Sequence, residues 1–273
     1  MSSEQAPMFW VDGEPATAVP LTDRGFQYGD GVFETIRVVQ GQIPFFDLHW
    51  QRLTDSCRAL SLPLDEVLLR TQLNDFLAGR QDGTLKIMVT RGSGGRGYNP
   101  AGAGGRTVLG WFAPVPLPDH RSRDGVSVMF CTTPLGHSPA LAGHKHLNRL
   151  EQVLARDELN GTDFGEGLMQ DLQGRVIEGT MSNLFLVESG RIITPDLSLC
   201  GVNGVLRRWL CQSEAVTIAS VSREQLLAVD EVFIGNSVMG VVPVVSCEGR
   251  QWQPGPVTRR VQQEVFQLFH VDG

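Results

Sequence analysis

The strongest constraint on the fold is a change of hydrophobic spacing within the first 112 residues. Segments 32–39, 85–89 and 108–112 have the apolar pattern of strands. Between the first two, apolar residues recur at helical spacing over 47–60 and 65–79, and each of these segments begins with an aspartate that can cap a helix. The amino-terminal part therefore predicts a sheet covered by two amphipathic helices.

Shorter segments complete the expected secondary structure. We expect strands at Met8–Asp12 and Ile43–Phe46, the second joined to the preceding strand by a tight hairpin at Gln40-Gly41. In the rest of the chain we expect strands at 126–132, 216–220, 231–234 and 241–246, turns between paired strands at 171–174 and 189–190, and helices at about 147–159, 202–212, 222–228 and 257–269. The pattern indicates an α+β fold with mixed α and β elements.

The segment around residues 114–124 separates two such regions. Three prolines stand at alternate positions from Pro114 to Pro118, followed by polar residues, which is typical of an interlobe linker. At about 150 residues per domain, a chain of 273 residues corresponds to roughly two lobes. We therefore expect a smaller N-terminal α/β lobe over 1–115, a linker over 116–124 and a larger C-terminal lobe over 125–273.

Charge, cysteine usage and hydropathy exclude several classes of protein. The net charge is −7 and the chain has no basic run, so nucleic acid is an unexpected partner. The five cysteines are widely spaced and form no Cys-x-x-Cys pair, which argues against a disulfide framework and a zinc site. No apolar stretch approaches the roughly 20 residues of a membrane span, and the first positive charge is Arg24. We expect a cytoplasmic protein without membrane association.

The glycine-rich segment 92–105 contains the pattern Gly-x-Gly-x-x-Gly, which is typical of dinucleotide-binding proteins. No helix is expected to follow it, because Asn99-Pro100 continues the loop, so we disfavour a dinucleotide site. Arg91 and Arg96 lie in or beside the loop, and two arginines on a closely approaching backbone suit recognition of a carboxylated small molecule. A solvated loop is the alternative.

Lysine is rare in this chain: Lys86 and Lys145 are its only two. Lys145 stands between His144 and His146 just before an expected helix. A lysine desolvated near other cations has the lowered pKa that Schiff-base chemistry uses, although a surface charge is the simpler interpretation. A metal cluster of His137, His144 and His146 lacks a further ligand at motif spacing, so we expect no metal site.

Three other features suit a phosphate-bearing pyridine aldehyde bound at such a lysine. Glu178 follows an expected strand and can hold a ring nitrogen protonated. The glycine-containing segment Gly201–Arg207 begins a helix and can present N–H groups to a phosphate. Arg52 lies on the first amphipathic helix. Each also has an ordinary explanation, as a surface acid, a capped helix and a solvent-facing arginine.

Together these residues resemble a known family. The segments that carry the resemblance are Asp23–Glu34, His49–Leu53, Arg91–Tyr98, Leu141–Gln152, Glu178–Phe185 and Gly201–Val205. The chain resembles the fold type IV pyridoxal-phosphate enzymes from Met8 to about Phe269, and within them the 4-amino-4-deoxychorismate lyases. The segments around Arg91 and Lys145 carry the likeness to the lyases, whereas the others are shared with branched-chain and D-amino-acid aminotransferases.

The resemblance implies how the cofactor is held, in a cleft between the two lobes. Lys145 forms the Schiff base with pyridoxal 5′-phosphate, and Glu178 contacts the ring nitrogen. Arg52 contacts the phosphate together with backbone groups of Val205 and Leu206.

Further site residues follow from the same comparison. Asn236-Ser237 matches the family's other phosphate contact, within about one residue of alignment. Phe33 matches a position that lines the substrate side of the cofactor. Arg91 and Arg96 are our candidates for the two substrate carboxylates, on physical grounds.

The implied activity is a lyase reaction in folate biosynthesis, in which 4-amino-4-deoxychorismate gives 4-aminobenzoate and pyruvate. The resemblance also implies a homodimer. The alternatives are a branched-chain or D-amino-acid aminotransferase of the same fold, which the sequence Phe33-Glu34 favours, and a cofactor-binding protein without catalysis.

Overall fold

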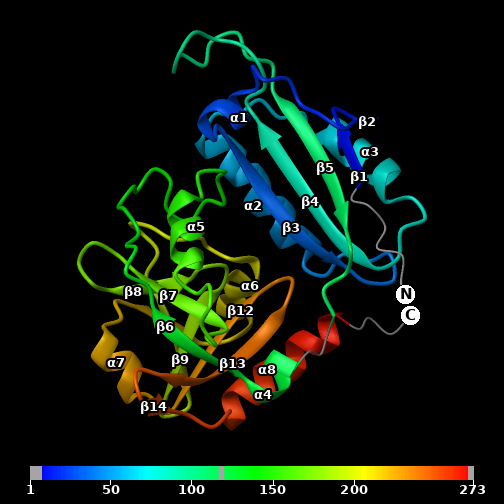
Figure 1. Ribbon diagram of the computed structural model, residues 1–273. Helices are drawn as coiled ribbons and strands as arrows, with labels where there is room; N and C mark the ends of the chain where they lie inside the picture. The colour runs from blue at the N-terminus through cyan, green and yellow to red at the C-terminus, as the bar shows by residue number, and fades with distance from the viewer. Residues whose placement is uncertain (1–7, 117–119, 270–273) are drawn as a thin grey trace. The chain divides into compact units, whose positions relative to one another are not determined.

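The chain is organised as two compact units (Figure 1). The structure is a computed structural model that describes residues 8–116 and 120–269. The first unit comprises Met1–Val115 with His144–Asn148, and the second comprises Pro116–Gly143 with Arg149–Gly273. The chain therefore leaves the first unit after residue 115 and returns to it only over 144–148.

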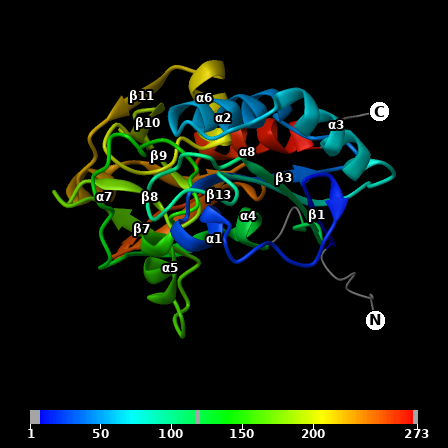
Figure 2. The ribbon, with the colours of Figure 1, turned by 90° about the horizontal axis from the view of Figure 1, so that it is seen from above.

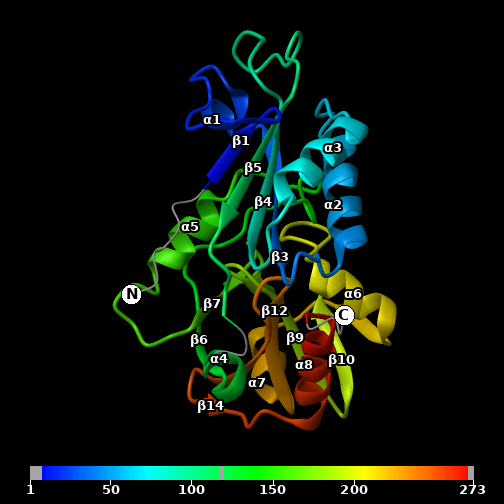
Figure 3. The same cartoon turned by 90° about the vertical axis from the view of Figure 1, so that its right-hand side faces the viewer.

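The first unit is built on one antiparallel sheet with the strand order β2-β1-β5-β4-β3. Its elements are β1 (Met8–Val11), β2 (Glu14–Pro15), α1 (Arg24–Tyr28), β3 (Gly31–Val38), α2 (Phe46–Ala59), α3 (Glu66–Leu77), β4 (Gly83–Thr90) and β5 (Arg106–Phe112). Helices α2 and α3 lie together on one face of this sheet (Figure 3). Ile36, Leu53, Leu73 and Leu85 are among the fully buried residues between them. The sheet and two covering helices are as expected.

The two faces of this sheet carry different side chains. Val32 and Ile36 of β3 point to the helices, whereas Phe33 points the other way, because successive strand residues alternate. Glu34 is on the helix-facing side and is only 1% exposed. A charged residue therefore occupies a core position in β3.

Residues 144–148 extend the sheet beyond its edge strand β3. The amide of Phe33 donates to the carbonyl of Lys145, and the amide of Leu147 donates to the carbonyl of Gly31, both at 2.9 Å. Because the backbone is engaged in this pairing, the helix expected at about 147–159 begins only at Leu150.

The expected strand Ile43–Phe46 is wrong. The tight turn at Gln40-Gly41 exists, with positive φ at both residues, but the pairing is a single bridge between Val39 and Gln42. Phe45 adopts a left-handed conformation, and Phe46 already begins α2. Ile43 and Phe46 of this segment pack against the core between the sheet and the helices instead of forming a strand.

The second unit is built on a sheet that closes on itself. Its elements are α4 (His120–Asp124), β6 (Val126–Phe130), α5 (Leu150–Asp157), β7 (Glu166–Gln170), β8 (Val176–Gly179), β9 (Asn183–Glu188), β10 (Arg191–Pro195), α6 (Val205–Ser213), β11 (Val216–Ala219), α7 (Arg223–Ala228), β12 (Glu231–Asn236), β13 (Gly240–Cys247), β14 (Arg250–Gln251) and α8 (Pro256–Phe269). The strands follow the order β9-β12-β13-β6-β7-β8, and β8 pairs again with β9. Strands β10 and β11 continue from β9 (Figure 2), and β14 pairs with β13.

The turns expected in this unit are present. Residues 171–174 join β7 to β8, and the two-residue turn Ser189-Gly190 joins β9 to β10, with positive φ at both of its residues. Fully buried apolar side chains line the enclosed core, including Val128, Leu168, Leu184 and Ile234. Closure of the sheet could not be read from the sequence, because it depends on the β8–β9 pairing.

The expected linker over 116–124 is in part a helix. Residues 120–124 form α4, with Ser122 buried and its carbonyl accepting hydrogen bonds from Arg259 and Gln262 of α8. Residues 117–119 lie outside the described residues. Among the helices of 8–116 and 120–269, none is both long and apolar enough to cross a membrane.

Candidate functional site

Lys145 is positioned by main-chain pairing with the edge of β3. Its Nζ lies 4.3 Å from the centroid of the Phe33 ring, and the backbone amide of Phe33 holds the Lys145 carbonyl. The structure therefore brings together two of the residues that the sequence singled out, from positions 112 apart in the chain.

Side chains on both sides of Lys145 anchor this segment. The imidazole Nδ1 of His144 lies 2.9 Å from the hydroxyl of Ser56 on α2. Burial lowers the pKa of His144, which favours the neutral ring in this hydrogen bond. The side-chain amide of Asn148 donates to the carbonyl of Gly29 at 2.9 Å. Lys145 is thus held between two fixed points of the first unit.

A buried ion pair lies on the neighbouring part of β3 and α2. The Arg52 guanidinium donates to both carboxylate oxygens of Glu34, at 2.7 and 2.6 Å. His49 places Nδ1 2.6 Å from the same carboxylate. All three side chains are at least nine-tenths buried. The sequence identified Arg52 but missed Glu34 and His49.

Electrostatics fix the charge state of this cluster. Burial raises the pKa of Glu34, but the charge of Arg52 and the hydrogen bonds of His49 and Arg52 more than offset this and lower it to about 2. Burial lowers the pKa of His49, against the opposing effect of Glu34. Near neutral pH the carboxylate is ionised, and the neutral imidazole donates its Nδ1 proton to it.

In the second unit, Glu178 lies at the end of β8 and is buried. Its Oε2 accepts a hydrogen bond from the amide of Val202 at 2.8 Å. The positive φ of Gly201 turns the chain into this contact. Arg149 faces Glu178 with its positive charge, although burial lowers the pKa of Arg149. The carboxylate is therefore fixed by the backbone and has a cation nearby.

Asn183 links this turn to the start of α6. Its side-chain amide donates to the Val202 carbonyl at 2.9 Å, and its oxygen accepts from the Gly204 amide at 3.1 Å. A Cβ at Gly204 would collide with that oxygen. Glycine is thus required here for close approach.

The first turn of α6 can accept an anion. Val205 and Leu206 follow the N-cap Gly204, which supplies no side-chain cap, whereas Asp65 caps α3. The first amides of a helix have no carbonyl one turn earlier to bind, and the helix dipole favours negative charge there. The backbone groups expected to hold a phosphate are therefore at a helix start.

Asn236 and Ser237 begin the turn between β12 and β13. The Asn236 side chain accepts from the amides of Val238 and Met239, both at 2.9 Å, and donates to the Met181 carbonyl at 3.0 Å. Ser237 is buried, with an exposed fraction of 7%. The Asn236 side chain therefore stabilises the turn through hydrogen bonds to the protein backbone.

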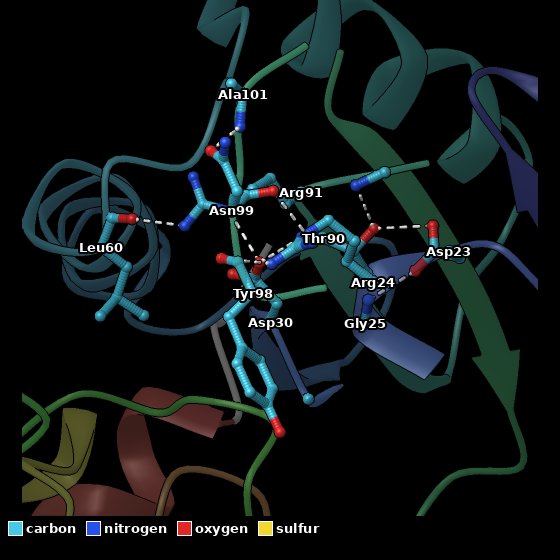
Figure 4. A network of polar contacts seen from close by, with 12 residues as sticks. Asp23, Arg24, Gly25, Asp30, Leu60, Thr90, Arg91, Tyr98, Asn99 and Ala101 are labelled. Carbon is cyan, nitrogen blue, oxygen red and sulfur yellow. Dashed lines mark hydrogen bonds and ion pairs between the residues drawn. The ribbon is translucent and has the colours of Figure 1, made fainter. Parts of the chain in front are cut away.

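Arg91, a candidate substrate ligand, is engaged by contacts within the first unit. Its guanidinium donates to Asp30 at 2.8 Å and to the carbonyls of Leu60 and Ser61 at 2.8 and 2.7 Å (Figure 4). All of its donor nitrogens are thus engaged. Arg91 anchors the strand that leads into the glycine-rich loop.

Arg24 fastens the loop itself. It donates to Asp30 at 2.9 Å and to the carbonyls of Gly97 and Tyr98 (Figure 4). No helix begins in 91–105, as the sequence led us to expect. Arg96 lies exposed in this loop, so its guanidinium is the one of the two candidates that is accessible.

A different cluster replaces the histidine group considered from the sequence. His137, Asp171 and Cys200 place ligand-type atoms within 4.8 Å of one another, whereas His144 is engaged by Ser56. Arg175 donates to Asp171 at 2.7 Å, and burial raises the pKa of Cys200 to about 12. A cation would have to compete with the arginine, so these residues are better described as an ion pair with a buried thiol beside it.

Comparison with known proteins gives one consistent result. Residues 31–247 match the model of the family described as amino-transferase class IV. The chain is 41% identical to an aminodeoxychorismate lyase of Vibrio harveyi, over 93% of this chain and 98% of that protein. It is 31% identical to a D-alanine aminotransferase of Bacillus licheniformis, over 90% of this chain and 89% of that protein.

Comparison with solved structures gives the same relatives as comparison of sequences. The crystal structure of 4-amino-4-deoxychorismate lyase from Pseudomonas aeruginosa superposes with a TM-score of 0.89 and 44% identity, covering 94% of this chain and 97% of that one. A branched-chain amino acid aminotransferase of Escherichia coli gives a TM-score of 0.85 at 26% identity, covering 97% and 95%. The α+β fold expected from the sequence is confirmed, and the chain belongs to the class IV aminotransferase family.

Proposed function

We propose that this protein is a pyridoxal-phosphate-dependent aminodeoxychorismate lyase, which converts 4-amino-4-deoxychorismate to 4-aminobenzoate and pyruvate in folate biosynthesis. The observation that carries the cofactor chemistry is the placement of Lys145 against Phe33 on the edge of β3. The choice of the lyase over an aminotransferase is supported by the 41% and 44% identities to proteins named as lyases.

The residues of both units fit the cofactor. The N-cap Gly204 has no side chain to cap the first turn of α6, so the amides there would be open to a phosphate. Glu178 offers a buried carboxylate for a protonated ring nitrogen. Arg52, whose charge is balanced by Glu34, would contribute hydrogen-bond donors to the phosphate site, and the turn at Asn236-Ser237 would add polar contacts.

The chain's own groups then perform the reaction. Bound pyridoxal 5′-phosphate supplies a pyridinium ring that accepts the electron pair left by deprotonation. Lys145 would hold the cofactor and would remove the proton at the substrate ring carbon that bears the amine. Glu178 would hold the ring nitrogen in its protonated form. Loss of the enolpyruvyl group gives an aromatic ring, so the protein mainly has to position groups and direct one proton.

Substrate recognition would involve Phe33 and Arg96. Phe33 lies beside the Lys145 amine and would line the substrate side. Arg96 is accessible for one carboxylate, whereas Arg91 is committed to Asp30 and two carbonyls. A homodimer and a cytoplasmic location, which the sequence led us to expect, remain proposals.

The second candidate is an aminotransferase, in which the same lysine returns the proton to the cofactor and a keto acid is consumed. The dipeptide Phe33-Glu34 favours it, because it resembles the corresponding sequence of the aminotransferases. This alternative requires a second substrate, so it can be separated from the lyase by experiment.

The test uses the purified protein loaded with pyridoxal 5′-phosphate and incubated with 4-amino-4-deoxychorismate without any keto acid. We expect 4-aminobenzoate and pyruvate in equal, catalytic amounts. Absence of both products, together with amino transfer from D-alanine or a branched-chain amino acid to 2-oxoglutarate, would assign the aminotransferase instead. Failure of the protein to bind the cofactor at all would reject both functions.

A further inference from the structure

The only two lysines of the chain face the same aromatic ring. The Nζ of Lys145 lies 4.3 Å from the centroid of the Phe33 ring, and the Nζ of Lys86 lies 5.3 Å from it. The two nitrogens are therefore within about 10 Å of each other, a separation at which like charges still repel inside a protein. The arrangement joins residues from β3, β4 and the 144–148 segment.

Strand register explains why Lys86 reaches this point. Thr35 of β3 pairs with Lys86 of β4, and Phe33 pairs with Met88. Because strand residues alternate between faces, Lys86 and Phe33 share the face opposite α2 and α3. Lys86 is half-buried, so its charge is only partly screened by water.

The charge of Lys86 adds to the field of the other charged groups around the 144–148 segment. No ion pair of Lys86 with a carboxylate occurs among residues 8–116 and 120–269. Charged or titratable groups on the elements beside the 144–148 segment include Glu34 and Arg37 on β3, Asp47, His49, Arg52, Asp55 and Arg58 on α2, and His144 and His146 in the segment itself. Arg37 shares the face of Phe33 and Lys86 and donates to the carbonyl of Val115, and Asp55 raises the pKa of His144 against the effect of burial. Glu34 and Arg52 neutralise one another, and burial lowers the pKa of His49 and of His144, which keeps both rings neutral.

We propose that Lys86 is a positioning residue for the lyase reaction, whose ammonium charge, acting across the Phe33 ring, favours the neutral amine form of Lys145. Lys86 acts through Lys145 and touches no reacting atom in this role. The neutral amine is the form that attaches a carbonyl cofactor and later accepts a proton. The inference rests on the role proposed above for Lys145.

The expected size follows from the separation. Two unit charges about 10 Å apart at an effective dielectric constant of about 20 shift a titration by about one pH unit, or tenfold in the fraction of neutral amine. Removing the charge of Lys86 should therefore raise the pKa of Lys145 by about that amount, and an arginine in its place should preserve most of the effect.

The experiment measures the titration of the Lys145 amine separately from that of Lys86. The full-length protein without cofactor is treated with limiting acetic anhydride between pH 6 and 11, and acetylation at residue 145 is followed by peptide mass spectrometry. The chain's low lysine content makes the readout unambiguous. In Lys86→Met we expect a midpoint about one pH unit higher and acetylation at pH 7.5 about tenfold slower, whereas Lys86→Arg should resemble the unmodified protein.

Several results would overturn the proposal. An unchanged midpoint for Lys145 in Lys86→Met would do so, as would an equal shift in Lys86→Arg. Lys86→Gln provides the same measurement if the methionine variant does not fold. An increase in KM for the substrate with no change in the Lys145 midpoint would show that Lys86 acts on the substrate instead.

Failure of the proposed function gives a different pattern. A protein that takes up no pyridoxal 5′-phosphate would lack the visible absorbance band in every variant, yet its acetylation midpoints would still report on the Lys86 charge. With a working cofactor site, the visible band should form about tenfold more slowly in Lys86→Met at pH 7.5. The same rate in both proteins would contradict the inference alone.

Discussion

The candidate site residues of the two units are held by different physical means. The first unit uses buried charges: Arg52, Glu34 and His49 are bonded to one another at distances of 2.6 and 2.7 Å. The second unit uses backbone amides and glycine, with Gly204 held against Asn183. A buried charge is costly once its partner is lost, whereas a backbone cradle is sensitive to added volume. The first unit should therefore respond to removal of charge and the second to addition of a methyl group.

The largest effect on activity should come from replacing Lys145, which lies in the first unit. Lys145→Ala removes the group that we propose transfers the proton, so we expect lyase turnover to fall to background while the protein remains folded. Product formation and circular dichroism measure the two properties. Substantial remaining lyase activity would contradict the assignment of Lys145.

Breaking the buried ion pair should have the next largest effect. Arg52→Met leaves the Glu34 carboxylate buried without its main partner, which costs about 3–5 kcal/mol in the free energy of unfolding. It should also remove the preference of the protein for pyridoxal 5′-phosphate over pyridoxal. Urea unfolding and cofactor titration measure both changes.

Arg58 on the same helix provides the matched control. It pairs with Asp55, but its side chain is 65% exposed. Arg58→Met should change stability by no more than about 0.5 kcal/mol. Equal losses in the two variants would mean that burial does not distinguish these ion pairs.

The same cluster should give a pH dependence of stability. The pKa of Glu34 is lowered to about 2 in the folded protein, below its value in an unfolded chain. Its contribution, roughly 3 kcal/mol, is therefore complete above about pH 4.5 and is lost as the pH falls towards 2. Unfolding by urea between pH 5 and 2.5 should be less pH-dependent in Glu34→Gln. Parallel curves for the two proteins would argue against an ionised, paired Glu34.

Gly204→Ala should weaken cofactor binding through the backbone amides at the start of α6 in the second unit. The added Cβ collides with Asn183, so the start of α6 must shift, and we expect pyridoxal 5′-phosphate to bind about tenfold more weakly, equivalent to about 1.4 kcal/mol. A Cβ at Gly104 meets nothing within 4 Å, so Gly104→Ala is the control. Unchanged cofactor affinity in Gly204→Ala would remove α6 from the phosphate site.

The smallest effect should separate the two arginines of the glycine-rich loop. Arg96→Ala should raise KM for the lyase substrate with little effect on stability, because Arg96 is exposed. Arg91→Ala should instead lower stability by about 1–3 kcal/mol, because its buried acceptors lose their donors. Steady-state kinetics and urea unfolding distinguish these roles, and the reverse pattern would restore Arg91 as the substrate ligand.

The sequence predicted best those parts of the molecule that depend on local pattern. Periodicity located the two helices over the first sheet, and Asp65 caps α3 as expected. Composition could not show that Lys145 belongs to the first unit, because this depends on pairing with an edge strand far away in the chain. Likewise the contacts of Arg91 with the carbonyls of Leu60 and Ser61 depend on a segment about 30 residues earlier in the chain, so the sequence did not reveal them.

Glu34 and His49 left signals that could have been recognised. Glu34 interrupts the apolar alternation of a strand at a core position, between Val32 and Ile36. His49 and Arg52 are three residues apart on one helix, so they share a face. A charge at a core position together with a cation on the covering helix predicts a buried ion pair. The meeting of both lysines at Phe33 had no such signal, since it depends on strand register.

The most direct test of the site is the point of covalent attachment. The purified protein loaded with pyridoxal 5′-phosphate is reduced with borohydride, digested and mapped by mass spectrometry. We expect the pyridoxyl group on Lys145 and none on Lys86. Attachment at Lys86, or no attachment in protein that has bound the cofactor, would contradict the assignment of Lys145 on which the proposed function depends.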